Sequence, residues 1–124
     1  MYKLLQPLQN QSIFWWLSVF IWAGLIFYLS SQPAVQTTEQ ILGDYLVKKL
    51  AHLFVYGVLY MLLIKALKPQ SLQTHLMALV FCCLYGVSDE LHQSFVPGRY
   101  PKLNDVWFDT LGAGLAHLKA RQLI

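Results

Sequence analysis

The chain has 124 residues, of which 56% are hydrophobic and only 12% are charged, and its mean hydropathy is +0.46. This composition is too apolar for a soluble domain of this length and is typical of a small polytopic membrane protein. The net charge of +3 is modest and is not concentrated in a basic run, which argues against nucleic acid as a partner.

Four apolar segments are predicted to form transmembrane helices, because each is close to the roughly 17–25 residues that cross a bilayer. They cover about residues 13–30, 49–67, 75–93 and 105–120. The last segment is the weakest, since it contains Asp109 and His117. Residues 41–47 are predicted to form a separate short helix at the membrane surface. The predicted fold is therefore an all-α membrane protein, a bundle of four transmembrane helices in a single domain over residues 1–124.

The distribution of charge predicts the orientation of this bundle. If the two termini share one side, that side collects five basic residues and no acid: Lys3, Lys65, Lys68, Lys119 and Arg121. The other side collects four basic residues together with all six acids. Because cytoplasmic loops carry the basic excess, we expect both termini to be cytoplasmic and the acid-rich end to face outward.

The sequence assigns structural roles to a set of small residues, to two cysteines and to two histidines. Small residues recur at every fourth position of the third and fourth helices and predict close helix packing: Ala78, Cys82 and Gly86, then Gly112, Ala116 and Ala120. The adjacent cysteines Cys82 and Cys83 are interpreted as small core residues rather than as a disulfide or metal ligands. His75 and His117 lie near the predicted cytoplasmic helix ends and are interpreted as interfacial residues or as residues that interact with a helix C-terminal dipole, rather than as ligands.

Most of the remaining ionisable groups gather at the predicted outer end. Helical spacing places them on shared faces: Lys49, His52 and Tyr56 on the second helix, Tyr85, Asp89, His92 and Gln93 on the third, and Asp105 and Asp109 on the fourth. Glu90 is adjacent, and Arg99 follows a Pro-Gly turn that we expect to hold it over the cluster. Since exposing these groups to lipid is costly, they should converge inside the bundle.

Such a cluster is compatible with four kinds of site. Lys49, His52 and Arg99 could jointly bind a phosphate or carboxylate. The acids and His92 could ligate a divalent metal, although the sequence has no specific metal motif such as HExxH. His52 or His92 could act as an acid–base catalyst oriented by a carboxylate such as Asp89. The fourth interpretation is a buried polar network that only holds the helices together.

Specific motifs make this sequence resemble a known family. They are Ser30-Ser31-Gln32-Pro33, Lys49-x-x-His52-x-x-x-Tyr56, and Asp89-Glu90-x-His92-Gln93-x-Phe95-x-Pro97-Gly98-Arg99 followed by Asp105-x-x-x-Asp109-x-x-Gly112. Over about residues 13–117 the chain resembles the VanZ-like family. The resemblance implies a four-helix, multi-pass protein of the bacterial inner membrane. The founding member is associated with low-level resistance to the glycopeptide teicoplanin.

The function expected from these observations is the binding of an anionic envelope-lipid or glycan-precursor headgroup in an outward-facing polar pocket. A polyprenyl-phosphate lipid is the natural candidate, and the ligand-binding residues would be Lys49, His52, Tyr56, Glu90, Gln93, Arg99, Asp105 and Asp109. One alternative is a membrane enzyme acting on a lipid-linked substrate, with His52, Asp89 and His92 as candidate catalytic residues. Another is a structural subunit whose partner supplies the chemistry. A transport path through so small a bundle would need a homo-oligomer.

Overall fold

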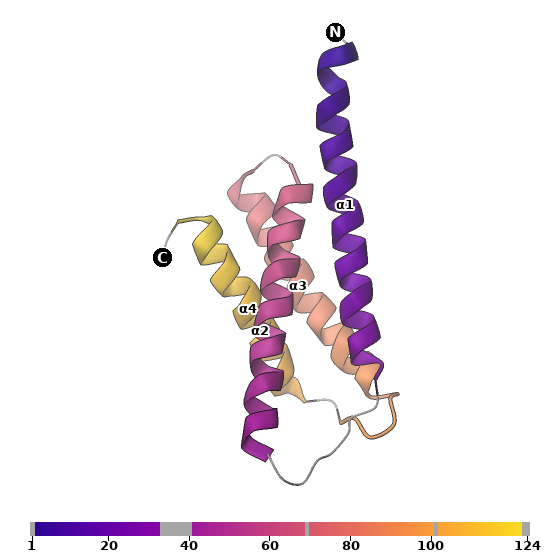
Figure 1. Cartoon of the computed structure of the whole chain (residues 1–124). Coiled ribbons are helices and arrows are strands. Elements are labelled where there is room, and N and C mark those ends of the chain that lie inside the picture. The colour runs from indigo at the N-terminus through magenta and orange to yellow at the C-terminus, as the bar shows by residue number, and fades with distance from the viewer. Residues whose placement is uncertain (1, 33–40, 69, 101, 123–124) are drawn as a thin grey trace.

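The computed structural model describes residues 2–32, 41–68, 70–100 and 102–122. Four helices form in these ranges: α1 (Tyr2–Ser30), α2 (Ile41–Ala66), α3 (Leu72–Gln93) and α4 (Leu103–Ala120). No strand occurs in the described residues, so the predicted all-α class is confirmed. Successive helices run in opposite directions, and α1 therefore begins at the same end of the bundle as α4 finishes (Figure 1).

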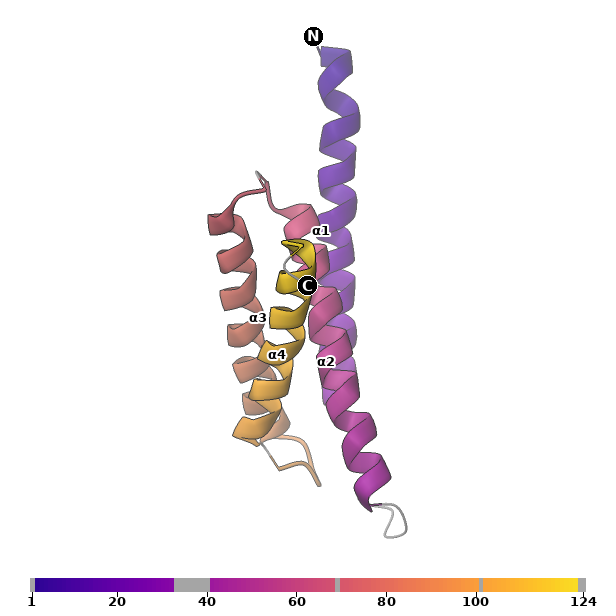
Figure 2. The same ribbon diagram turned by 90° about the vertical axis from the view of Figure 1, so that its left-hand side faces the viewer.

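The two ends of the bundle differ in charge. At the lower end in Figure 1, α1 and α3 end while α2 and α4 begin, and we call this the acidic end because the carboxylates of α3 and α4 lie there. The opposite end, called the basic end, carries Lys65 and Lys119 near the last turns of α2 and α4. The N-terminal part of α1 projects beyond the other helices at the basic end (Figure 2).

The helices begin earlier than the hydrophobic segments suggested. Residues 41–47 do not form a separate interfacial helix but are the first turns of α2. That prediction was wrong because the weakest helix former in this stretch is Gly43, whose cost of about 1 kcal/mol does not break a helix that continues on both sides. The start of α3 at Leu72 is set by Ser71, whose side-chain oxygen accepts a hydrogen bond from the Thr74 amide at 3.2 Å.

Three of the helices are long and apolar enough to cross a membrane. The qualifying stretches are Gln11–Ser30, Tyr45–Ala66 and Leu72–Gln93, with mean hydropathies of 1.8, 1.6 and 1.2. Large apolar side chains such as Phe20 and Ile21 are exposed on the outside of the bundle, as expected where the surrounding solvent is lipid. The shorter and more polar α4 does not meet the same criteria.

α2 and α4 run parallel and form the closest helix contact in the bundle. A Cβ atom on Gly112 would meet the backbone of Leu53, 2.8 Å from its Cα atom. A Cβ atom on Gly57 would lie 3.3 Å from the Gly112 carbonyl oxygen. Small residues thus let the two backbones meet directly, as the spacing on the fourth helix predicts. We call this contact the α2–α4 seam; it aligns polar residues of the two helices along its length.

Candidate functional site

The acidic end contains a group of inward-facing polar side chains that we call the polar centre. It comprises Lys49, His52 and Tyr56 from α2, Asp89, Glu90 and Gln93 from α3, and Asp105 and Asp109 from α4. The spacing along α2 and α4 explains why their residues lie together, because they are three, four or seven positions apart; on α3, Gln93 is four positions from Asp89 and three from Glu90. Three helices that meet at one end therefore bring most of the predicted site residues together.

One ion pair and one histidine–carboxylate hydrogen bond cross the α2–α4 seam within the polar centre. The Nζ atom of Lys49 contacts Oδ1 of Asp105, and both side chains are largely buried. Nδ1 of His52 lies 2.5 Å from Oδ1 of Asp109, whose side chain is completely buried. Because a carboxylate bonded to Nδ1 fixes the orientation of an imidazole, Asp109 presents Nε2 of His52 for chemistry or binding. Nε2 has no hydrogen-bond partner among the residues that the structure describes.

The residues of α3 connect the polar centre to its surroundings. The Gln93 amide donates hydrogen bonds to Asp89 at 3.2 Å and to the Ser30 hydroxyl at 2.9 Å, which joins α3 to the end of α1. Oε2 of Glu90 accepts a hydrogen bond of 2.9 Å from the backbone amide of Lys102, just before α4. The segment between α3 and α4 is thus joined to the polar centre by a hydrogen bond to the Glu90 carboxylate.

Apart from Oδ1 of Asp105, which contacts Lys49, three buried polar atoms of the polar centre have no hydrogen-bond partner among the described residues. They are the hydroxyl oxygen of Tyr56, Oε1 of Glu90 and Oδ2 of Asp109. Tyr56 and Asp109 are 0% exposed and Glu90 is 5% exposed. A buried polar atom without a partner costs about 1–3 kcal/mol, so three of them in one place are expected to serve a ligand or bound water.

Gly86 makes room for this arrangement. A Cβ atom at this position of α3 would lie 3.0 Å from Oδ2 of Asp109 and 3.3 Å from its Cβ atom. The missing side chain therefore lets Asp109 sit between α3 and α4 with one carboxylate oxygen uncommitted. Gly86 appeared in the sequence only as one member of a small-residue repeat, and its contact with a site carboxylate had no sequence signal.

Two predicted site residues lie against α1 instead of joining the polar centre. Nε2 of His92 is 2.8 Å from the Ser31 hydroxyl, and the ring stacks on Phe27 with 4.2 Å between centroids. Arg99 donates hydrogen bonds to two carbonyl oxygens at the end of α1, those of Gln32 at 2.6 Å and Leu29 at 3.2 Å. The guanidinium thus caps a helix C-terminus, where a positive charge is favourable, rather than lying over the cluster.

The charge balance of the polar centre is acidic. Its four carboxylates face one lysine and one histidine, both of which are already paired across the seam. Among the residues that the structure describes, no three His, Cys, Asp or Glu side chains are grouped so that they could hold a metal ion. The polar atoms of the site that lack a partner are therefore mainly hydrogen-bond acceptors, which complement a ligand with several donor groups.

A second polar cluster lies nearer the basic end and was not predicted. The hydroxyl of Tyr60 lies 2.6 Å from Nδ1 of His75 and 2.8 Å from Nδ1 of His117, so it joins α2, α3 and α4. Tyr60 is 0% exposed and His75 is 7% exposed. We call these three residues the histidine centre. The two histidines are therefore not independent interfacial residues, and nothing in their separate sequence positions shows that one hydroxyl bridges them.

The comparisons with known proteins identify the family. No curated protein and no solved structure matches this chain. The family model described as VanZ/LLP1 matches residues 14–123, a range that includes the polar centre, the histidine centre and all of α2, α3 and α4. The chain therefore belongs to the VanZ/LLP1 family, as its motifs predicted.

Proposed function

We propose that this protein binds the headgroup of a lipid-linked envelope precursor in the polar centre, with α4 completing a bundle of four membrane-spanning helices. The observation that carries the proposal is the set of three buried, unpartnered polar atoms on Tyr56, Glu90 and Asp109. A stable protein keeps such atoms where a ligand or ordered water satisfies them. Two of these atoms belong to α2 and α3, whose apolar stretches are long enough to cross a membrane, which suits a headgroup whose lipid tail remains in the bilayer.

The chemistry of these atoms favours a sugar over a bare phosphate. Hydroxyl groups of a glycan precursor can donate hydrogen bonds to Glu90 and Asp109, whereas a phosphate supplies further negative charge and acceptors. Lys49 and His52 would have to leave their carboxylates before they could neutralise an anion. The glycan part of the headgroup is therefore the part that the polar centre is best suited to recognise.

The cellular setting follows from the same proposal. With both termini in the cytoplasm of a bacterium, the acidic end faces outward across the inner membrane, which is where lipid-linked envelope precursors are used. The opposite end has five basic residues against four at the acidic end and no acid, which agrees in direction with the usual excess of positive charge in cytoplasmic loops. A contribution to glycopeptide tolerance, including tolerance of teicoplanin, would then act through the precursor that the protein holds.

The test compares two tyrosines at the acidic end. The purified protein is mixed with a polyprenyl-phosphate-linked sugar or with polyprenyl phosphate alone, and the retained mass is measured by native mass spectrometry. We expect the sugar-bearing lipid to be retained more strongly and Tyr56→Phe or Glu90→Gln to reduce that retention by roughly tenfold, the effect of losing about 1.4 kcal/mol. Tyr100→Phe, which removes an exposed hydroxyl, is the matched control. Equal retention of both lipids, or no effect of Tyr56→Phe, would contradict the proposal.

A second candidate function is acid–base catalysis on the same lipid-linked substrate. It is favoured by the 2.5 Å contact between His52 and the fully buried carboxylate of Asp109, which leaves Nε2 of the imidazole available. If the protein is an enzyme, incubation with the sugar-bearing lipid should yield a product of altered mass. His52→Gln should abolish that product while the substrate is still retained. If the unaltered protein retains the sugar-bearing lipid but forms no product, the protein binds this lipid without converting it.

A further inference from the structure

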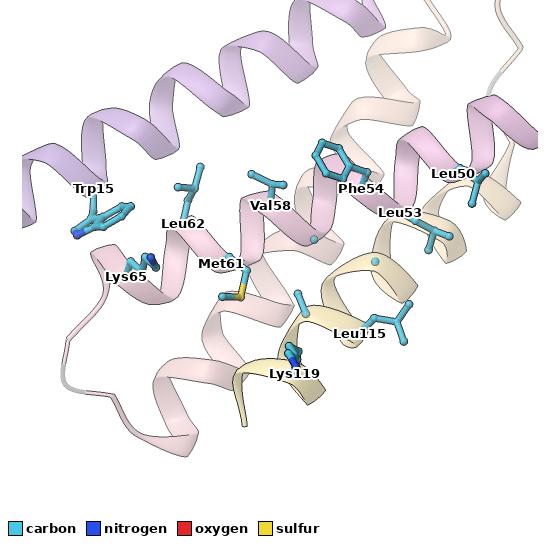
Figure 3. A pocket seen from close by; sticks show the side chains of 13 residues that line it. Trp15, Leu50, Leu53, Phe54, Val58, Met61, Leu62, Lys65, Leu115 and Lys119 are labelled. Atoms are coloured by element: carbon cyan, nitrogen blue, oxygen red, sulfur yellow. The ribbon is translucent and has the colours of Figure 1, made fainter. Parts of the chain in front are cut away.

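A groove lies on the side of the bundle formed by α1, α2 and α4, away from the polar centre. Its volume is about 650 Å³, within the range of roughly 300–1,000 Å³ that is usual for ligand sites. In Figure 3, Leu50 and Leu53 lie at one end of the groove, Lys65 lies beside Trp15 at the other end, and Lys119 lies on the α4 side. We call it the lysine groove.

The α2–α4 seam explains why the surface is hollow there. Gly57 and Gly112 contribute to the lining of the groove, and neither has a side chain to fill it. The walls carry larger apolar side chains such as Phe54, Met61 and Leu115. Small residues that let two helices approach closely therefore also leave a channel along their line of contact.

The length of the groove suits a lipid chain. From Leu50 to Lys65 the rise along α2 is roughly 22 Å at about 1.5 Å per residue. A bilayer hydrocarbon core is about 30 Å thick, so this distance exceeds the depth of one leaflet. A chain that begins at the headgroup level near Lys65 can thus lie in the groove over its whole leaflet.

The charge at one end of the groove specifies the headgroup. Of the lining residues in the described part of the chain, only Lys65 and Lys119 are charged, and both lie at the basic end. Nζ of Lys65 lies 4.4 Å from the ring centroid of Trp15, so α1 holds this ammonium group beside the groove. Two lysines without a neighbouring acid in the lining complement a headgroup of net negative charge rather than a zwitterionic headgroup, whose own cation offsets its phosphate.

We propose that the lysine groove is a binding site for an anionic phospholipid of the leaflet at the basic end. The acyl chain lies along Met61 and Leu115, and the phosphate contacts Lys65 and Lys119. This site shares no side chain with the polar centre, and its two lysines lie at the basic end of the bundle. It therefore does not depend on the function proposed for the polar centre.

The experiment is a competition between two lipids for the full-length protein. Equal amounts of dioleoyl phosphatidylglycerol and dioleoyl phosphatidylcholine are added in detergent, and the ratio of bound lipids is read by native mass spectrometry. We expect the anionic lipid to be preferred by roughly five- to tenfold. Lys65→Gln combined with Lys119→Gln should bring the ratio close to one while lipid remains bound.

Matched controls separate the groove from the general charge of the surface. Lys68→Gln combined with Arg121→Gln removes the same charge from exposed positions near the same end, outside the groove lining, and should preserve the preference. Leu115→Trp places a larger side chain at an exposed position of the groove wall and should reduce binding of both lipids. Unchanged melting temperatures confirm that each variant is folded. An equal loss of preference in both double variants, or full lipid binding by Leu115→Trp, overturns the proposal.

Discussion

The polar centre and the histidine centre lie along the same α2–α4 seam, but their polar atoms are satisfied to different degrees. Tyr56 and Tyr60 are four residues apart on α2, and both are 0% exposed. The hydroxyl of Tyr60 has two imidazole partners, at 2.6 and 2.8 Å, whereas that of Tyr56 has none among the described residues. A satisfied network stabilises helix packing by itself, while an unsatisfied one indicates a place for a ligand.

The protonation of the histidine centre follows from this arrangement. A tyrosine hydroxyl has one proton, so Tyr60 donates to one Nδ1 atom and accepts from the Nδ1–H group of the other histidine. The two imidazoles must therefore differ in tautomer or in protonation state. The polar centre differs in kind, because its four carboxylates offer acceptors that Lys49 and His52 only partly use.

The largest effect on both centres is expected from Gly112→Ala. The added methyl group would overlap the backbone of Leu53, so the seam must open and both sets of contacts across it must lengthen. We expect a drop in melting temperature of roughly 10 °C or more, corresponding to about 3 kcal/mol or more. Gly114→Ala is the control, since a Cβ atom there meets nothing within 4 Å and should be neutral or stabilising. Similar melting temperatures for the two variants would show that the close approach is unimportant.

The next largest effect concerns the buried ion pair of the polar centre. Lys49→Met leaves the Asp105 carboxylate buried without its cation, which should cost about 3–5 kcal/mol of unfolding free energy. Replacing both partners, as Lys49→Met with Asp105→Leu, should recover most of that loss because no charge is left unpaired. Thermal unfolding in a mild detergent measures both variants. A double variant as unstable as the single one would mean that the pair is not coupled as the structure shows.

A smaller loss is expected in the histidine centre from Tyr60→Phe. Removing the hydroxyl leaves nitrogen atoms of His75 and His117 without their partner, which should cost about 1–3 kcal/mol. The melting temperature should fall, and ring-nitrogen NMR signals of both histidines should shift together. A shift confined to one histidine would show that Tyr60 does not bridge them.

The smallest effect distinguishes the two centres most directly. Tyr56→Phe removes a hydroxyl that has no partner, so the unfolding free energy of the ligand-free protein should change by less than about 0.5 kcal/mol or should rise. Measured beside Tyr60→Phe, it compares two buried hydroxyls on one helix. A loss of stability equal to that of Tyr60→Phe would place Tyr56 in a structural network and remove the main difference between the centres.

Much of the candidate site could be predicted from helical periodicity. Lys49, His52 and Tyr56 lie on one face of α2, and the structure turns that face toward Asp105 and Asp109 on α4. This prediction is possible because an α-helix repeats every 3.6 residues and because buried polar groups in an apolar chain must find one another. Periodicity does not report how far one helix is rotated relative to the next, so the direction of His92 toward Ser31 was missed.

The sequence alone determined that this is an apolar, all-helical chain, and its motifs identified the family. It predicted four membrane-spanning segments, of which three coincide with helices long and apolar enough to cross a membrane. Those properties depend on the composition of the chain and on the spacing of residues along it, and both can be read from the sequence without a structure. Only the tertiary structure decided that Arg99 caps α1, that Gly86 accommodates Asp109 and that Tyr60 joins two distant histidines. Each of these is a contact between segments that are distant in the sequence, and such contacts depend on the rotation and separation of whole helices rather than on local sequence pattern.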